Sequence, residues 1–310
     1  QFRNTLSNET SNTVDFILPD ITYIKQFADA PLDGKMQLVN RVSYSARDLG
    51  VDVTKASTRL DWSYRYISGA GFVWNLENKA QFDAYMFDEH GPQTGLPDSE
   101  TETLAADSFG ATLSYPLVRR SPTSRQTLKP KAQLVLTTDN DSFDRIPYRT
   151  SAIYELSASN LFSLAAPEDE TSRINYGVGH TLETADGLRT RFFLGQSYNL
   201  SNDNFSMSSG FSDEASAVIT EAEVGYGGLS LTQNLRIDRE NGQILRQRSG
   251  AYFQGKRFSA GADYTFLDTG QVGNGTPREE LTSRLDVRIS DHWRFGARFQ
   301  QDLELSDRIR

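Results

Sequence analysis

The most distinctive side chains of this sequence are arginines that recur at every second position within alternating segments. Arg59 and Arg65, for example, share a face with Asp61, and Arg189 and Arg191 share another. A guanidinium group binds phosphate or carboxylate through parallel N–H donors, and a basic surface attracts anionic sugars and phosphates. We therefore expect a path or binding surface for an anionic saccharide or phosphate at these positions: Arg41, Arg47, Arg59, Arg65, Arg173, Arg189, Arg191, Arg236, Arg246, Arg248, Arg284 and Arg288.

Each of these arginines also has a purely structural interpretation, in which the charges pair across strands and keep a surface hydrated. The acidic residues that give the chain its net negative charge are expected mainly in loops, where carboxylates bind divalent cations or only aid solubility. These loop acids are Asp98, Glu100, Glu102, Asp107, Glu168, Asp169, Glu170, Asp213 and Glu214.

The remaining reactive side chains do not form a recognisable catalytic centre. The chain has three histidines, with His90 and His292 in expected loops or turns and His180 on an apolar face. No G-x-S-x-G motif is present, so only a phospholipase with a loop serine stays open as an enzymatic alternative. The sequence DNDS at 139–142 lacks the glycine and closing glutamate of a calcium loop. We predict no enzymatic activity, no cofactor and no bound metal.

The elements that position the arginines are expected to be β-strands. In 174–200, INYGVGHTLETADGLRTRFFLGQSYNL, two alternating arms flank Asp186-Gly187, a pair that suits the positive φ angles of a hairpin turn. One face of the hairpin is apolar, and the other carries arginines together with Gly177, Gly179 and Gly195. Glycines at such positions indicate strands that bend or leave room for a neighbour.

Alternation of period two continues along the chain and predicts about fourteen strands, the first near 14–25. The expected connections alternate in length. Short turns are expected at 68–69, 186–187, 227–228, 254–255 and 291–292. Long loops are expected at 88–107, 139–171, 201–214 and 268–278, with a short connection at Asn241-Gly242 on their rim. The alternation of short turns on one rim with long loops on the other requires 139–171 to be one loop, although 153–156 has the pattern of a strand.

Composition narrows the function class. The chain of 310 residues is 37% hydrophobic and 11% aromatic, with no cysteine and a net charge of -9. The negative charge argues against nucleic-acid binding. No run of 18 apolar residues is present, so no transmembrane helix is predicted.

Two folds fit the alternation: a soluble β-sandwich or barrel with its apolar face inside, and a transmembrane β-barrel with its apolar face toward lipid. Strand lengths of 10–14 residues suit a bilayer. The parity of turns and loops and the aromatic residues near strand ends also favour the membrane. We predict an all-β, antiparallel transmembrane β-barrel of the outer-membrane type, whose polar face lines a lumen.

The sequence resembles the barrel part of the LptD family of lipopolysaccharide-assembly proteins. The resemblance rests on LPDITY at 18–23, ARDLGVDVTKASTRLDW at 46–62, SYPLVRR at 114–120, and DNDSFDRIPYRTSAIYELSASNLF at 139–162 followed by RINYGVGHTL. The family's N-terminal jellyroll and last barrel strands have no counterpart here. We therefore expect residues 1–310 to form a single segment of an incomplete barrel.

The resemblance implies a function in the outer membrane of a Gram-negative cell. It implies transport of lipopolysaccharide and its insertion into the outer leaflet, as the barrel of an export translocon. The implied partners are lipopolysaccharide, membrane lipids, an LptE-like lipoprotein plug and periplasmic bridge proteins, without nucleic acid. The alternative function is a passive porin or solute channel, for which we expect a constricting loop folded inward.

Overall fold

The computed structural model describes residues 16–46, 50–90, 99–138, 157–164, 172–200, 211–212, 215–268 and 277–303. These residues form one antiparallel sheet of seventeen strands with a short 3-10 turn, η2 (Pro31–Asp33). The strands are β1 (Phe16–Phe27), β2 (Lys35–Ala46), β3 (Gly50–Ile67), β4 (Val73–His90), β5 (Ser99–Ser114), β6 (Leu117–Arg120), β7 (Ser124–Thr137), β8 (Arg173–Thr184), β9 (Arg189–Asn199), β10 (Phe211–Ser212), β11 (Ala215–Ser216), β12 (Val218–Tyr226), β13 (Leu229–Ile237), β14 (Ile244–Gln254), β15 (Phe258–Leu267), β16 (Arg278–Arg288) and β17 (Arg294–Asp302).

Strand length agrees with a bilayer-spanning sheet. Strands β6, β10 and β11 have only four, two and two residues. The other fourteen have between 9 and 18 residues, from β12 at the short end to β3 and β4 at the long end. About 9–11 residues of a tilted strand cross a membrane. The predicted number of about fourteen strands is thus confirmed for the long strands. Within the described ranges, no helix is both long and apolar enough to span a bilayer.

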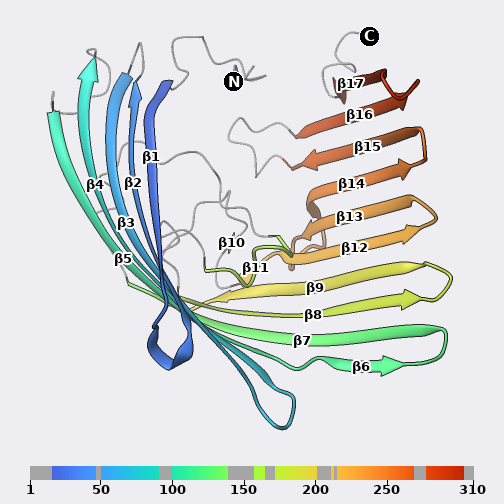
Figure 1. The fold of residues 1–310 in the computed structure, drawn as a ribbon, viewed down its shortest axis with the longest axis horizontal. Coiled ribbons are helices and arrows are strands. Elements are labelled where there is room, and N and C mark those ends of the chain that lie inside the picture. Colours follow the sequence, from blue (N-terminus) through green and yellow to red (C-terminus); the bar gives the residue numbers. More distant parts are fainter. Residues whose placement is uncertain are drawn as a thin grey trace.

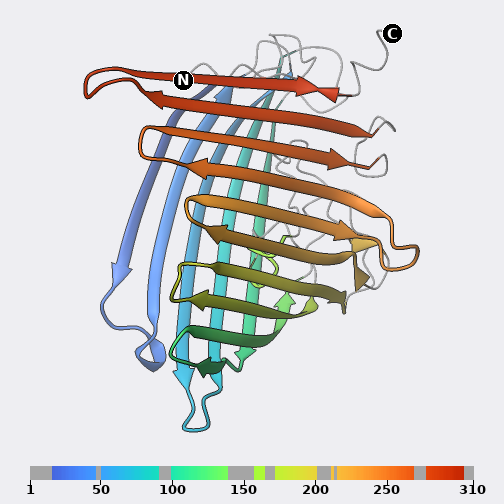
Figure 2. The same ribbon diagram turned by 90° about the vertical axis from the view of Figure 1, so that its right-hand side faces the viewer.

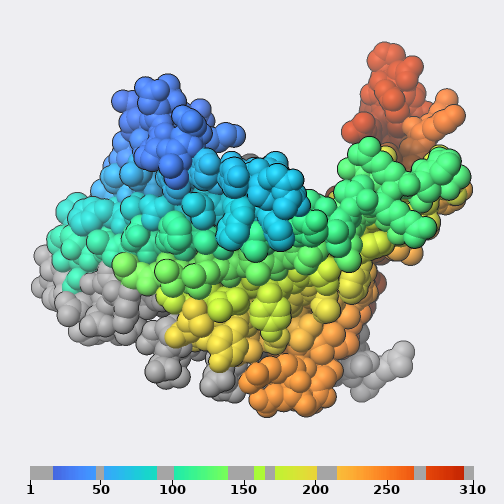
Figure 3. All heavy atoms as spheres, turned by 90° about the horizontal axis from the view of Figure 1, so that it is seen from below, coloured from blue at the N-terminus to red at the C-terminus, as the bar shows by residue number. Residues whose placement is uncertain are grey.

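The sheet is open. Each long strand pairs with its sequence neighbours, from β1–β2 through β9–β12 to β16–β17. The edge strands β1 and β17 are not paired with each other in the described part of the chain. Seen from below, the blue residues of the first strands and the red residues of the last stand apart (Figure 3). The prediction of an incomplete antiparallel barrel is confirmed.

The sheet folds into two walls. We call β1–β5 the first wall and β7–β17 the second wall; in Figure 1 the first rises steeply and the second runs across the picture. Figure 2 shows the strands of the two walls running in nearly crossed directions. The bend follows β5, where Tyr115 donates its backbone N–H to the carbonyl of Pro130 at 3.2 Å before the chain enters β6. The angle between the walls creates a concave side.

Short turns and longer connections alternate as predicted. Short turns follow β3, β8, β12, β14 and β16, and longer connections follow β4, β7, β9 and β15. Strand β7 pairs directly with β8, so no described strand lies between them, and the patch 153–156 lies outside the described residues. The turn 121–123 between β6 and β7 was not predicted, although the sequence Ser-Pro-Thr is a turn signal.

Two local predictions were partly wrong. The predicted loop 88–107 is shorter, because β4 extends to His90 and β5 begins at Ser99. Glu100, Glu102 and Asp107 are therefore strand residues rather than loop residues, since cross-strand pairing outweighs the weak β-propensity of acidic side chains.

The turn at 185–188 departs from expectation only in detail. Gly187 has a φ of +96°, whereas Asp186 is not among the residues with positive φ. The Thr184 hydroxyl donates to the Asp186 carboxylate, and this hydrogen bond lowers the pKa of Asp186. The backbone N–H of Gly187 donates to the carbonyl of Thr184 at 3.1 Å, so the loop is a three-residue turn ended by one left-handed glycine rather than a two-residue type I′ turn.

Candidate functional site

Toward the loop end of β8 and β9, the polar face of the sheet is the buried one. Arg173, Asn175 and Ser197 are fully buried, whereas Ile174 and Tyr198, which alternate with them, are 38% and 39% exposed. A soluble sheet would bury the apolar face. The apolar exterior is typical of a barrel wall that faces lipid.

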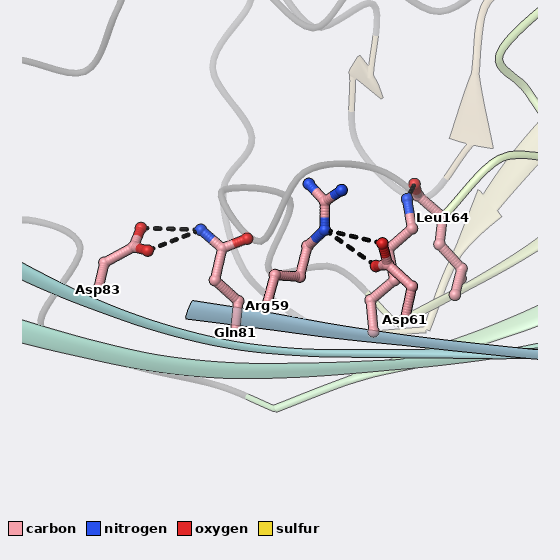
Figure 4. A network of polar contacts seen from close by, with 6 residues as sticks. Arg59, Asp61, Gln81, Asp83 and Leu164 are labelled. Carbon is pink, nitrogen blue, oxygen red and sulfur yellow. Dashed lines mark hydrogen bonds and ion pairs between the residues drawn. The ribbon is translucent and has the colours of Figure 1, made fainter. Parts of the chain in front are cut away.

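The segment 157–164 shows that the polar face is also the concave one. Lys79 of the first wall donates from Nζ to the carbonyl oxygen of Leu164 at 2.6 Å. On the second wall, Leu161 is fully buried against Ile219. One segment that touches both walls must lie between them, so we call this polar surface the inner face. Figure 4 shows side chains of the first wall rising from the strands on the side where Leu164 lies.

Further contacts fasten this segment across the second wall. The Gln133 amide donates to the carbonyl of Phe162 at 3.1 Å, and Lys131 Nζ lies 4.0 Å from the centre of the Phe162 ring. Phe162 also meets Phe193 edge to face, with ring centres 6.2 Å apart. The segment is therefore an ordered lining of the inner face.

Three cations on the first wall are paired with carboxylates. Lys55 Nζ lies 2.8 Å from an oxygen of Asp83, whose side chain is 1% exposed. Arg59 Nε lies 2.9 Å from Asp61, as Figure 4 shows. Arg41 donates to Asp20 from both Nε and Nη2, at 2.7 and 2.6 Å. Arg41–Asp20 and Lys55–Asp83 join neighbouring strands, as the structural interpretation of the charges expects, whereas Arg59 and Asp61 both belong to β3.

Uncharged side chains form a buried network on the inner face, near the loop end of β7, β8 and β9. Asn175 donates to Gln133 Oε1 at 2.9 Å and accepts from the Ser197 hydroxyl at 2.6 Å. The backbone N–H of Ser197 donates to Ser216 Oγ at 3.0 Å. This network explains why polar residues tolerate burial here, since each buried group has a hydrogen-bond partner.

The C-terminal strands carry arginines that face other arginines. In the strand register, Arg236 lies opposite Arg246, and Arg284 lies opposite Arg298. Arg288 lies opposite Arg294 in the same way. Like charges at directly opposite positions are unfavourable in a sheet. Arg191 differs, because its Nη1 lies 3.2 Å from Glu223 on β12. The opposed arginine positions of the inner face thus lie on the second wall.

Two polar pockets adjoin these arginines. One, of about 310 Å³, lies toward the loop end of β13 and β14 and includes Arg236, Arg246 and Arg248 in its lining. The other, of about 420 Å³, lies at the turn end and is lined by Lys256, Arg257, Asp286, Arg288 and Arg294 among others. A third pocket, of about 570 Å³, is apolar and includes Leu113, Tyr176 and Leu194, side chains of the lipid-facing wall.

The structure places eleven of the twelve predicted arginines on described strands, and their alternation puts them on the inner face. Arg47 lies outside the described residues, as do Asp98, Glu168, Asp169, Glu170, Asp213 and Glu214. Sequence reasoning missed Lys79, Lys131 and Gln133, which hold the segment 157–164. Their alternation with apolar residues could have indicated the face, but not the distant segment that they contact.

The comparison with known families decides the identity. The model of the family described as LPS transport system D, LptD, matches residues 1–299. The chain belongs to the LptD family. No curated protein matches the chain at a significant level. The family match and the open all-β sheet confirm the predicted resemblance, outer-membrane location and role in lipopolysaccharide transport.

Membership of the LptD family also separates the two functional alternatives. An inward-folded segment was expected of a porin, and the segment 157–164 is one, so this feature alone does not distinguish a channel from an LptD barrel. The family match favours transport of lipopolysaccharide. LptD is a transport family, and among the described residues no group of three or more potential ligand side chains is placed to hold a metal ion.

Proposed function

We propose that the inner face of this LptD-family barrel is the path of the phosphorylated saccharide of lipopolysaccharide. The single observation that carries the proposal is the set of opposed arginine pairs on β16 and β17, Arg284–Arg298 and Arg288–Arg294. Such pairs cost free energy in the absence of an anion and bind one favourably through several charge-assisted hydrogen bonds.

The path runs from the turn end of the sheet to its loop end. Outer-membrane barrels place short turns on the periplasmic side and longer loops outside. The pocket with Arg288 and Arg294 lies at the turn end, and the pocket with Arg236 and Arg246 lies toward the loop end. A phosphorylated headgroup therefore meets a basic pocket near each side of the membrane.

The predicted arginines have unequal roles along this path. Arg236, Arg246, Arg248, Arg284 and Arg288 contact the saccharide, because they belong to the opposed pairs or the pockets. Arg41, Arg59 and Arg191 hold carboxylates and shape the wall. Arg65, Arg173 and Arg189 contribute to the general positive potential.

The specific protein partners of the barrel follow from the resemblance to the family. Residues 1–310 act as one barrel segment, which receives lipopolysaccharide from periplasmic bridge proteins and encloses an LptE-like lipoprotein. The concave, polar inner face supports this proposal, because a plug with a hydrogen-bonding surface can pair with it.

The test is a double substitution, Arg284→Gln with Arg298→Gln, in the full protein expressed in cells. We expect less lipopolysaccharide at the cell surface and greater sensitivity to detergents and large antibiotics, at unchanged barrel levels. The control, Lys25→Gln with Lys35→Gln, removes the same charge from the first wall and leaves both measurements unchanged. Normal surface lipopolysaccharide in the arginine variant contradicts the proposed path.

A further inference from the structure

Two glutamines and a serine interrupt the outer face of the second wall, the apolar side opposite the inner face. Gln233 of β13 alternates with Leu231 and Leu235 and lies directly opposite Ser249 of β14. Gln247 lies one outward-facing position from Ser249, opposite Leu235. We call Gln233, Gln247 and Ser249 the outer polar cluster. Because leucines flank Gln233 on both sides along β13, the cluster lies within the lipid-facing band.

The outer polar cluster lies far from both ends of its strands. Gln233 is the fifth of the nine residues of β13, and Ser249 is the sixth of the eleven residues of β14. Strands of about 9–11 residues cross a bilayer, so both side chains lie near its middle. The hydrocarbon core holds no water, and a polar group without a hydrogen-bond partner is costly there.

The three side chains bond to one another but leave polar atoms unused. Gln247 donates from Nε2 to Ser249 Oγ at 2.9 Å, and Ser249 Oγ donates to Gln233 Oε1 at 2.8 Å. A carboxamide offers two N–H donors and a carbonyl acceptor. Within the described ranges, the Gln233 amide nitrogen and the Gln247 carbonyl oxygen have no hydrogen-bond partner. Each glutamine therefore keeps one polar atom for an occupant from outside the chain.

A third glutamine on the same face shows the contrast. Gln196 of β9 accepts the Tyr176 hydroxyl at 2.6 Å and donates from Nε2 to the carbonyl of Ser216 at 2.7 Å. Both polar atoms of that amide are satisfied within the chain, so it tolerates contact with lipid. The outer polar cluster is not satisfied in this way, and an acyl chain forms no hydrogen bonds. Its amides are stabilised only by an occupant that donates and accepts.

Three alanines adjoin the cluster on the neighbouring strands. Ala222 of β12 lies opposite Gln233, and Ala251 of β14 lies opposite Ala262 of β15. Small side chains let another protein approach closely within a membrane. The outward-facing side chains of β7–β9 are mostly larger, and the exposed ones are Leu128, Leu134, Leu136, Ile174, Tyr176, Phe192, Leu194 and Tyr198. Strands β12–β15 are paired on both sides, so their outer face does not depend on an open edge.

A second copy of the chain offers a matching surface. Two copies inserted in the same orientation are related by an axis along the membrane normal, and this rotation leaves every residue at its own depth. The outer polar cluster of one copy therefore meets that of the other in the middle of the bilayer. Because a carboxamide both donates and accepts, glutamine pairs with glutamine across such an axis. A different protein would need polar groups at the same depth.

We infer that the outer face of β12–β15 is a two-fold interface between two copies of this protein in the membrane, centred on the outer polar cluster. Gln233 and Gln247 of each copy form hydrogen bonds with the same residues of the other, and the alanines allow the two sheets to approach. The interface lies on the opposite side of the sheet from the proposed saccharide path and does not rest on it.

The test is photo-crosslinking of the full protein in living cells. Leu231→p-benzoylphenylalanine places the reactive group beside the cluster, and we expect an adduct with twice the mass of one copy. Leu128→p-benzoylphenylalanine is the control, since Leu128 of β7 lies in the same cross-strand row as Gln233, and we expect no adduct of that mass. No dimer adduct at Leu231, or equal amounts at both positions, overturns the interface. An adduct of Leu231 with a different protein overturns the second copy as the occupant.

Removal of the amides distinguishes an interface from a wall that faces only lipid. Gln233→Leu with Gln247→Leu keeps the outer face apolar, so the barrel still folds and its level in the membrane is measured alongside. We expect about threefold less dimer adduct or lower, because one hydrogen bond within a membrane changes an association constant by about that factor. Gln233→Asn with Gln247→Asn keeps shorter amides and should give an intermediate amount. Unchanged adduct in the leucine variant contradicts the inference.

Copurification provides a measurement that does not depend on the crosslinker. Two copies of the full protein with different tags, expressed together, should copurify in mild detergent. Gln196→Leu removes an amide from β9 and should leave copurification unchanged, whereas Gln233→Leu with Gln247→Leu should reduce it. Equal copurification of these two variants contradicts a role for the outer polar cluster.

Discussion

Leu161 occupies the space that the missing side chain of Gly195 leaves on the inner face of β9. A Cβ atom at Gly195 would lie 2.6 Å from Leu161 Cδ2 and 2.6 Å from Phe193 Cζ. Gly177 on β8 is similarly close to Phe193, at 2.9 Å. Gly177 and Gly195 thus leave room for an aromatic side chain and a returning segment, as their inward position predicted, whereas Gly179 has no such neighbour.

Gly195→Val should therefore displace the segment 157–164 from the inner face. Overpacking of this kind costs about 1–3 kcal/mol. The measurement is hydrogen exchange of residues 157–164 in the full protein, which we expect to become faster. Gly179→Ala is the control, because the nearest atom to its added Cβ is 4.0 Å away. Unchanged exchange in Gly195→Val would show that the segment does not depend on this contact.

Lys79 should hold the other end of the same segment. Its ammonium group donates to Leu164 at 2.6 Å, and a hydrogen bond to a charged group contributes about 1.5–3 kcal/mol. Because the chain contains no cysteine, Leu161→Cys introduces a single reactive thiol. We expect Lys79→Met to increase the labelling rate of this thiol by a polar maleimide by about tenfold. Lys25→Met should leave the rate unchanged, and equal rates in both would contradict a role for Lys79.

Much of this architecture could be predicted from the sequence because alternation is a local property. Alternation at every second residue predicted the two faces of the hairpin 174–200. Strand length and the alternation of short turns with long loops indicated that its apolar face points outward. The placement of Leu161 against Gly195 and of Lys79 against Leu164 could not be predicted. Those contacts join residues 34 and 85 positions apart, and no local pattern encodes them.

The roles of individual arginines were equally hidden from the sequence. Arg59 and Arg236 look alike as members of an alternating run, yet one faces Asp61 and the other faces Arg246. The pair Arg59–Asp61 lies within one strand, whereas the residue opposite Arg236 depends on strand register, which is set by the lengths of turns and the positions of bulges. The irregularity between Arg236 and Ile237 shows how a small shift sets such pairings.

Burial should make the two ion pairs of the first wall unequal in stability. Lys55→Met leaves the carboxylate of Asp83, which is 1% exposed, without its cation, although Gln81 and Tyr85 still donate to it. Breaking a buried pair costs about 3–5 kcal/mol, and these donors place the expected loss near about 3 kcal/mol. Arg41→Gln breaks an exposed pair and should cost less than about 1 kcal/mol. Urea unfolding from lipid vesicles measures both, and equal losses would contradict the assigned burial.

The orientation of the sheet predicts that the same substitution lowers the free energy of unfolding by different amounts on its two faces. Leu194 is 40% exposed on the apolar face, among side chains that face lipid. Leu194→Arg should lower the free energy of unfolding in lipid vesicles by about 2–4 kcal/mol, as expected for a charge near the middle of the bilayer. The loss should shrink in detergent micelles, where the arginine reaches water more easily.

Thr265→Arg is the matched substitution on the inner face, where Thr265 lies opposite Arg248 and Glu280. A charge on this face stays in contact with water, so the expected loss is below about 1 kcal/mol. The reverse ranking would place the apolar face inside, as in a soluble sandwich, and would remove the basis for an anionic path along the arginines. The comparison therefore tests the inversion of the sheet on which the assignment of the arginines depends.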